Sequence, residues 1–529
     1  MPATPRFSLL LTVAFAGLAL WLAWHHELWR DEMQAWLIAR DSPDLRSLLL
    51  VGRYEGSPPL WHLLLRPLAL LTHRPEAMQL LQAAIAIVSF FLLCRFAPFS
   101  RREKVLLLFN YYLLFEYGTV CRQYLLGALL LGIACAFFPR GGRERPWVFI
   151  LSLVGAALTS VYGLILAAAM AAAFWGARAL AARRVPSGAP GPRWHPLPLA
   201  VLLAGLAGAA ASMLPAPDAL YAPADGWHFA WDPERLARLA CEFTNAHFLL
   251  PRPDGFFWIP AWLTDLGGPQ RCAIALAMPL FAGTAWLLRR VPAALIFYLA
   301  GAGGLLAFVY LKYLGFTRHA GFLFLALFFG CWLRASLGGA DGTSPPSAKS
   351  GAGGRAVRML LATILSVQAV TGVWAFWLDS TRRFSTGREV AAELAARRLD
   401  RAAIAAWPDS AGSVVAGWLD RSLYLPQSER TGSFVRWNTA RRERITDVEA
   451  LARAEQNSGP GPLVIVLDHT LPEELIRTHG LSVVGAFTGA LASFEDYFVY
   501  CRFPEDDPGR IAPLKGVAPP PAPASRRPS

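Results

Sequence analysis

Two adjacent carboxylates, Asp31 and Glu32, follow the first apolar run of the chain. Acidic side chains beside a membrane are costly unless they are solvated, paired or used in chemistry. A helix N-terminus accounts for one of them, because a carboxylate there interacts favourably with the helix dipole. It does not account for the polar residues that follow around the Pro58-Pro59 pair, which are Arg53, Glu55 and His62. We therefore predict that Asp31 and Glu32 mark an active site, with helix-start acids as the alternative.

Cationic and hydroxyl side chains recur at later turns between apolar runs. Arg122 and Tyr124 stand at one such turn, and Lys312, Arg318 and His319 stand at another. Taken singly, such residues are typical anchors at a membrane interface, where Lys and Arg snorkel and Tyr is favoured. Taken together, they place cations and hydroxyls on the face of the membrane where we expect the acidic pair. This combination suits an anionic lipid phosphate, for which Arg is the better ligand because it can donate two hydrogen bonds.

The elements that must position these residues are membrane helices. The chain has 529 residues, of which 55% are hydrophobic and 16% charged, whereas a soluble domain averages about 25% charged residues. Apolar runs of about 15–22 residues are candidate spans, and in hydrocarbon only a helix satisfies its own backbone hydrogen bonds. We expect a polytopic α-helical membrane protein with about eleven crossings. The predicted spans are Phe7–Trp24, Ala77–Ala97, Val105–Phe115, Val120–Phe138, Trp147–Ser160, Gly163–Ala181, Leu197–Leu214, Cys272–Leu288, Ala293–Tyr310, Gly321–Leu333 and Val357–Leu378.

The positions of the basic residues orient these spans. The net charge is +13, and most arginines stand at the ends of apolar runs, as the positive-inside rule predicts for cytoplasmic loops. The N-terminus is then cytoplasmic, and loops 25–75 and 216–270 face outward. The second of these loops is rich in aromatic residues, which predicts either an interfacial belt or a lid over a lipid. The apolar segment 58–72 carries Arg66 and Pro67 in mid-run, so we read it as a re-entrant or interfacial helix.

The end of the chain is ordinary and soluble in composition. A multi-span domain, 1–380, contains a Gly- and Ser-rich cytoplasmic linker at 335–355. Residues 381–505 are predicted to form an extracytoplasmic α/β domain, and the Pro-rich tail 506–529 is predicted to be disordered. The expected strands are Ser413–Ala416, Leu463–Leu467 and Tyr497–Arg502, and the expected helices are Arg388–Leu399 and Pro472–Thr478.

The order of these features resembles a known family. The first span, then Arg30-Asp31-Glu32, then Glu55-Gly-Ser-Pro58-Pro59-Leu-Trp61, is similar to bacterial polyprenyl-phosphate-sugar-dependent glycosyltransferases of the GT-C superfamily. These enzymes are relatives of protein O-mannosyltransferases and lipid A aminoarabinose transferases. Arg122-Gln-Tyr124 matches an Arg-x-Tyr motif of the family at the head of a later span. The resemblance covers roughly residues 8–335, and the terminal domain matches by position alone.

The resemblance implies a membrane enzyme of the bacterial cytoplasmic (inner) membrane. It would move a sugar from a polyprenyl-phosphate-linked donor to a lipid, polysaccharide or protein acceptor on the outer face. Asp31 would be the catalytic base, Glu32 would support it, and Arg122 would bind the donor phosphate. Transfer would occur in one displacement with inversion at the anomeric carbon, and Lys312, Arg318 and His319 are further candidates for the donor site.

The chain departs from the family pattern in one loop. Many members have Ser-Arg-Glu-Ala-Arg-x-Tyr where this chain has Tyr117-Gly-Thr119-Val120-Cys121-Arg122-Gln-Tyr124, so the first Arg and the Glu are missing. Glu116 is a candidate substitute at a different offset. Details of acceptor or metal binding there are left open. No cluster of His and Asp indicates a resident metal, although a divalent ion is used by some relatives.

Two other classes of function compete with a transferase. A lipid or solute transporter or flippase would also carry charges at membrane depth, but such proteins show internal repeats and broken midplane helices, and neither is evident. A scaffold or receptor would act through the terminal domain alone. Nucleic acid is not an expected partner, because no basic surface motif with interleaved aromatic residues occurs.

Overall fold

The structure, a computed structural model, describes residues 4–139, 145–183, 196–220, 226–250, 269–313, 315–338, 352–492 and 494–504. The predicted tail, most of the linker and part of the aromatic loop lie outside these residues. The chain divides into two compact units. The first contains 1–28, 35–383 and 436–439, and the second contains 29–34, 384–435 and 440–529. The short segment 29–34 therefore belongs to the C-terminal unit, although it lies near the start of the chain.

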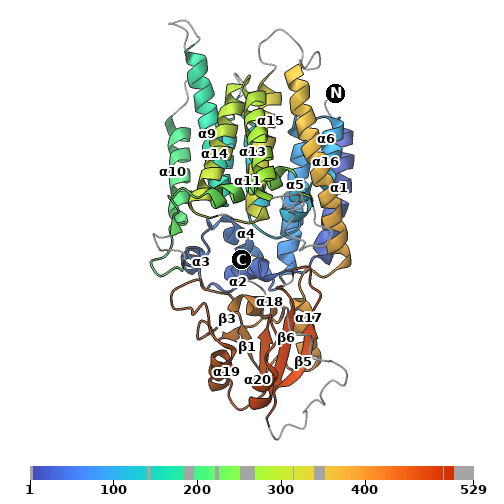
Figure 1. Cartoon of the computed structure of the whole chain (residues 1–529), viewed down its shortest axis with the longest axis vertical. Coiled ribbons are helices and arrows are strands. Elements are labelled where there is room, and N and C mark those ends of the chain that lie inside the picture. The colour runs from blue at the N-terminus through green and yellow to red at the C-terminus, as the bar shows by residue number, and fades with distance from the viewer. Residues whose placement is uncertain are drawn as a thin grey trace. The chain divides into compact units, whose positions relative to one another are not determined.

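The first unit is a set of helices that run beside one another (Figure 1). Neighbouring pairs include α1 with α5, α9 with α14, and α14 with α15. Among the described residues, six helices are long and apolar enough to cross a membrane, by length and composition. These are α1 (Pro5–His25), α5 (Glu76–Phe96), α9 (Val161–Ala182), α14 (Pro292–Leu311), α15 (Thr317–Leu337) and α16 (Ala352–Thr381).

Shorter apolar helices account for most of the other predicted spans. They are α7 (Tyr124–Ala136), α8 (Pro146–Ala157) and α10 (Pro196–Ser212), together with the apolar part Ala275–Leu288 of α13 (Pro269–Leu288). The predicted span Val105–Phe115 is wrong as a single helix. It is divided into α6 (Arg101–Leu106), a 3₁₀ turn (Leu107–Phe109) and a π-helical turn (Tyr111–Glu116), with extended backbone at Asn110 between the turns. The count of eleven crossings stays a prediction.

Several of the described helices are too short to cross a membrane and lie between the spans. α2 (Arg30–Asp41) begins in the second unit and continues in the first, and α3 (Leu45–Gly52) follows it. α4 (Leu60–Leu71) comes after the Pro-Pro pair and has only 12 residues. Arg66 in α4 donates hydrogen bonds to the carbonyls of Ala39 and Arg40 at 2.7 and 3.1 Å. α11 (Pro233–His247) is an amphipathic helix in the aromatic loop.

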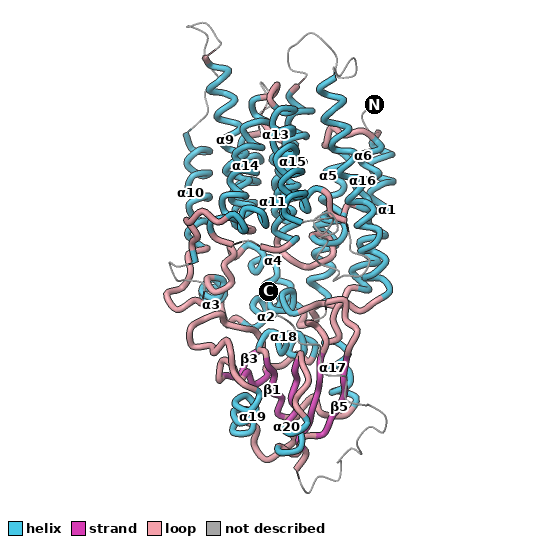
Figure 2. The backbone as a smooth tube through the Cα atoms, in the orientation of Figure 1, coloured by secondary structure: helices cyan, strands magenta, loops and turns pink. Residues whose placement is uncertain are grey.

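The second unit is built on one mixed six-stranded sheet, drawn in magenta in Figure 2. Its strand order is β3-β2-β1-β4-β6-β5, in which β1 lies parallel to β2 and β4 and the other pairs are antiparallel. The strands are β1 (Ala403–Trp407), β2 (Leu423–Leu425), β3 (Arg430–Gly432), β4 (Leu463–Leu467), β5 (Ser482–Phe487) and β6 (Tyr497–Arg502). The helices are α17 (Gly387–Ala396), α18 (Asp409–Trp418), α19 (Asp447–Gln456) and α20 (Glu473–Thr478).

The predicted α/β domain is thereby confirmed, including β4, β6, α17 and α20. The strand predicted at Ser413–Ala416 is wrong, because these residues lie in α18. The helix starts after Pro408, and the N–H of Asp409 donates to Oε1 of Gln427 at 2.8 Å. Val414 and Val415 are fully buried, so packing in the core overrides the β propensity of their branched side chains.

Candidate functional site

The acidic pair lies at the start of α2, inside the second unit. Glu32 is buried, and its Oε2 accepts a hydrogen bond from the N–H of Trp29 at 3.1 Å. This is the reach-back bond of a capping residue, which satisfies a backbone donor at a helix N-terminus. Asp31 is partly exposed. The two acids therefore differ: Glu32 shapes the turn, and Asp31 presents part of its surface outward.

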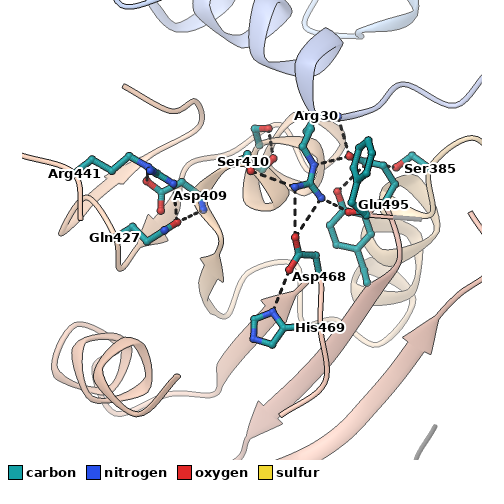
Figure 3. Close-up of polar contacts among 12 residues, drawn as sticks. Arg30, Ser385, Asp409, Ser410, Gln427, Arg441, Asp468, His469 and Glu495 are labelled. Carbon is teal, nitrogen blue, oxygen red and sulfur yellow. Dashed lines mark hydrogen bonds and ion pairs between the residues drawn. The ribbon is translucent and has the colours of Figure 1, made fainter. Parts of the chain in front are cut away.

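Arg30, the residue before the pair, makes several polar contacts within this unit (Figure 3). Its Nε donates to Oε1 of Glu495 at 2.6 Å. Its Nη1 donates to Oγ of Ser410 at 3.3 Å, and both terminal nitrogens lie 3.4 Å from Oδ2 of Asp468. Nη2 also donates to the carbonyl of Phe494, whose ring lies under the guanidinium. Arg30 is thus fixed from several directions.

The partner Glu495 is a fully buried carboxylate. Besides Arg30, it accepts hydrogen bonds from the hydroxyls of Ser385 and Tyr497 at 2.8 and 3.0 Å. Burial raises the pKa of Glu495, and the charge of Arg30 opposes that rise. Burial alone would lower the pKa of Arg30, but the neighbouring carboxylates raise it. The sequence did not indicate the two acidic partners of Arg30, Glu495 and Asp468, since they lie more than four hundred residues away.

A histidine extends the network. The Nδ1 of His469 lies 3.1 Å from Oδ1 of Asp468, and its Nε2 lies 2.9 Å from Oδ1 of Asp447. The indole of Trp407 donates to the same oxygen of Asp447 at 2.9 Å. Hydrogen bonds to Asp447 and Asp468 raise the pKa of His469 to about 9. At neutral pH the imidazole is therefore charged, and it supports the carboxylate that Arg30 contacts.

The first unit gathers several of the other predicted residues around His319. Its Nε2 lies 3.0 Å from the hydroxyl of Tyr124, and its ring stacks on Tyr162 with centroids 5.0 Å apart. The hydroxyl of Tyr117 donates to the carbonyl of Arg318 at 2.6 Å. The structure thus brings the turns at Tyr124 and His319 together, and their role in binding the donor stays a prediction.

Arg122 and His62 belong to the same cluster. The guanidinium of Arg122 lies 6.0 Å from the ring centroid of Tyr124. His62, on the short helix α4, is buried, and neither of its ring nitrogens has a hydrogen-bond partner among the described residues. Burial and the charge of Arg122 lower the pKa of His62 to about 4, so the imidazole is neutral. A buried imidazole without partners beside a cation is a polar site that a ligand can complete.

Three predicted residues have other contacts. Arg53 donates to the carbonyls of Leu214 and Pro215 at 3.1 and 3.0 Å. Glu55 lies in the turn after it, and its N–H donates to the carbonyl of Gly52 at 3.1 Å. The ammonium of Lys312 lies 5.3 Å from a ring centroid of Trp227, in the aromatic loop. Nothing in these contacts ties the three residues to Arg122, and their roles stay predictions.

Metal ligation was left open by the sequence. Among the described residues, no group of three or more His, Cys, Asp or Glu side chains is placed to hold a metal ion. Asp31 and Glu32 belong to a different unit from Arg122 and His319, so their roles as base and supporting acid also stay predictions.

Comparisons with known proteins give a fold. No family model matches the chain, and no curated protein matches it. Among solved structures, it is similar to ArnT from Cupriavidus metallidurans bound to undecaprenyl phosphate, with a TM-score of 0.51 and 13% identity over 94% of this chain and 98% of that chain. For the same protein in the apo state the TM-score is 0.49 and the identity 14%, over 92% and 97%. The likeness to the lipid-bound structure shows that this chain shares the fold of that protein, a set of apolar helices followed by a small C-terminal sheet domain.

Proposed function

We propose that this protein is a membrane glycosyltransferase that takes a sugar from a polyprenyl-phosphate-linked donor. The observation that carries the proposal is the polar cluster of Arg122, His62, Tyr124 and His319 in the first unit. It combines a cation with a buried imidazole whose nitrogens have no hydrogen-bond partner among the described residues. An anionic phosphate group carries a charge complementary to the guanidinium of Arg122 and offers acceptor oxygens to the imidazole of His62.

The fold supports this choice of ligand. The structure of ArnT with a similar fold contains undecaprenyl phosphate, and the present chain carries a cationic cluster within its helical unit. Because identity to that protein is low, the sugar and the acceptor remain part of the proposal. We assign the donor to the polyprenyl-phosphate class and the acceptor to the outer face of the bacterial inner membrane, with the C-terminal domain on that side.

The proposed reaction is one displacement. The carboxylate of Asp31 takes the proton of the acceptor hydroxyl or amine as that atom bonds to the anomeric carbon. The bond from the anomeric carbon to the phosphate oxygen breaks, and its electron pair leaves with the polyprenyl phosphate. Arg122 stabilises the charge on that phosphate. A leaving phosphate needs little protonation, so one carboxylate is enough, and the configuration inverts.

Lipid mass spectrometry tests the function. A strain that lacks the gene should accumulate a polyprenyl-phosphate sugar and lose its conjugate, and these two species identify the donor and the acceptor. The wild-type gene should restore the conjugate. Asp31→Asn should reduce transfer by about 10²–10⁴-fold, the usual contribution of a general base, with normal expression.

Asp44→Asn is a matched control for that test. Asp44 caps α3 through the N–H of Ser47 at 2.7 Å, and Asn caps equally well, so this variant should transfer normally. A fully active Asp31→Asn protein would refute the assignment of the base. A deletion strain with unchanged lipids would refute the transferase itself and favour a transporter.

A further inference from the structure

The place of Arg30 in the C-terminal sheet is where an open α/β sheet ordinarily binds a ligand. β1 and β4 are parallel neighbours, and the chain leaves them towards opposite sides of the sheet, β2 lying beside β1 and β6 beside β4. Such a switch point leaves a crevice at the carboxyl ends of the two strands. Ser410 follows the end of β1 and Asp468 follows the end of β4, and the guanidinium of Arg30 contacts both (Figure 3).

The segment 29–34 is held at its other end as well. The side chain of Gln34 donates from Nε2 to the carbonyl of Val435 and accepts at Oε1 from the N–H of the same residue, both at 2.8 Å. This pair of bonds imitates the pairing of two strands. Trp29 packs against the rings of Phe384 and Phe494, with centroids 6.4 and 5.8 Å apart.

A third contact lies between these two anchors. A Cβ atom added at Gly417 on α18 would lie 2.1 Å from the sulfur of Met33. The side chain of Met33 therefore packs directly on the backbone of α18 at this glycine. Met33 and Glu32 are fully buried, whereas Asp31 keeps part of its surface exposed. Asp31 is thus partly exposed beside two residues, Glu32 and Met33, that are fully buried.

We propose that Arg30 is the positioning residue for Asp31, and that the C-terminal domain fixes the acidic turn, which we define as residues 29–34 at the start of α2. The domain uses its sheet crevice to bind the chain's own Arg30 in place of a separate ligand. Through this contact it fixes the backbone on which the carboxylate of Asp31 stands. The inference rests on the proposed function in that Asp31 is the base of the transfer reaction.

Arg30→Lys is the first test, because it keeps the charge and loses the forked donor. One ammonium cannot serve Glu495, Ser410, Asp468 and the carbonyl of Phe494 together. Amide hydrogen exchange of the full-length protein should rise about tenfold or more at residues 31–34, as local opening becomes easier. In the complemented deletion strain, conjugate formation should fall about tenfold or more, since small displacements of a catalytic group are costly. Binding of undecaprenyl phosphate to the purified protein should change less than about twofold, within the scatter of unrelated substitutions.

Gln34→Ala is the second variant, because it loosens the other anchor and leaves the sheet crevice intact. It should raise exchange over the same residues and lower transfer in the same direction. Glu455→Gln is the matched control. Glu455 pairs with His479 and Arg502 at 3.0 and 2.9 Å in the same domain, away from the segment 29–34, so exchange there and transfer should match the wild type.

The outcomes separate the inference from the function it rests on. Unchanged exchange at residues 31–34 in Arg30→Lys overturns the positioning role, whatever the activity. Raised exchange with wild-type transfer also overturns the positioning role, because the acidic turn would then open without any effect on activity. A fully active Asp31→Asn protein refutes the assignment of Asp31 as the base. The exchange data still report, independently, whether Arg30 holds the acidic turn.

Discussion

Replacing Arg30 by Met should leave Glu495 as a buried carboxylate without its counter-charge. The Arg30 side chain is 13% exposed and that of Glu495 is not exposed at all. Removing one partner of a buried ion pair typically costs about 3–5 kcal/mol. Because Ser385 and Tyr497 still donate to Glu495, we expect the lower end, about 3 kcal/mol. For a domain of this size that corresponds to a fall in Tm of roughly 10 °C.

Adding Glu495→Gln to that variant should reverse part of the loss. Gln removes the orphaned charge and keeps an acceptor oxygen for Ser385 and Tyr497, so we expect a recovery of about 2 kcal/mol. In the wild-type background the same Glu495→Gln substitution should destabilise, because it leaves Arg30 with a weaker partner. The effect of one substitution on the free energy of unfolding thus changes sign with the background.

These four proteins (wild type, Arg30→Met, Glu495→Gln and the double variant) form a double-mutant cycle. Thermal unfolding of the purified proteins measures the coupling between the two residues. Lowering the pH towards 5 should also stabilise Arg30→Met relative to wild type, because burial raises the pKa of Glu495 and the variant lacks the arginine charge that opposes this rise. If Glu495→Gln lowers Tm equally in both backgrounds, the two residues are not coupled and the reasoning fails. The double variant should regain stability without regaining transfer.

Three further predictions concern other parts of the molecule. Tyr124→Phe removes the 3.0 Å hydrogen bond to buried His319 and should destabilise by about 1–3 kcal/mol and weaken undecaprenyl phosphate binding; unchanged stability and binding would contradict the cluster. His469 has a pKa of about 9 in the folded protein, raised by its hydrogen bonds to Asp447 and Asp468. Its contribution to stability should be complete below about pH 6.5 and vanish as the pH rises through 9. The difference in Tm between wild type and His469→Gln should therefore be larger at pH 6 than at pH 10. A Cβ at Gly372 would lie 1.8 Å from the carbonyl oxygen of Phe109, so Gly372→Ala should cost at least about 1–3 kcal/mol, whereas Gly208→Ala, with open space around it, should be neutral or stabilising in a thermal unfolding assay.

The helices of the first unit and the sheet of the second were predictable where hydrophobic length or pattern is decisive. Long apolar runs predicted α1, α5 and α14, and a run of β-branched residues flanked by turn residues predicted β4. β1 was missed because Ala403–Trp407 is rich in alanine, a poor strand former, and it forms a strand only because it is buried between β2 and β4.

The site was predictable in its local parts. Arg122-Gln-Tyr124 and Arg318-His319 were identified by residue type and place, and the structure brings Tyr124 and His319 together. The role of Arg30 was not predictable, because its partner Glu495 lies 465 residues further along the chain. One signal was available: Asp468 directly follows the buried strand Leu463–Leu467, and polar residues in that position commonly bind something.

The membership of residues 29–34 in the C-terminal unit has a consequence for synthesis. Arg30 leaves the ribosome early, and Glu495 follows 465 residues later, which at roughly 5–20 residues per second is about half a minute to a minute and a half. Closing a loop of that length costs about 5 kcal/mol of chain entropy, so other contacts of the sheet must form first. Until then the acidic turn, residues 29–34, lacks its contacts to the C-terminal sheet. A nascent or truncated chain that ends before Glu495 would therefore insert its helices and remain inactive, so that activity begins only once the whole protein has been made.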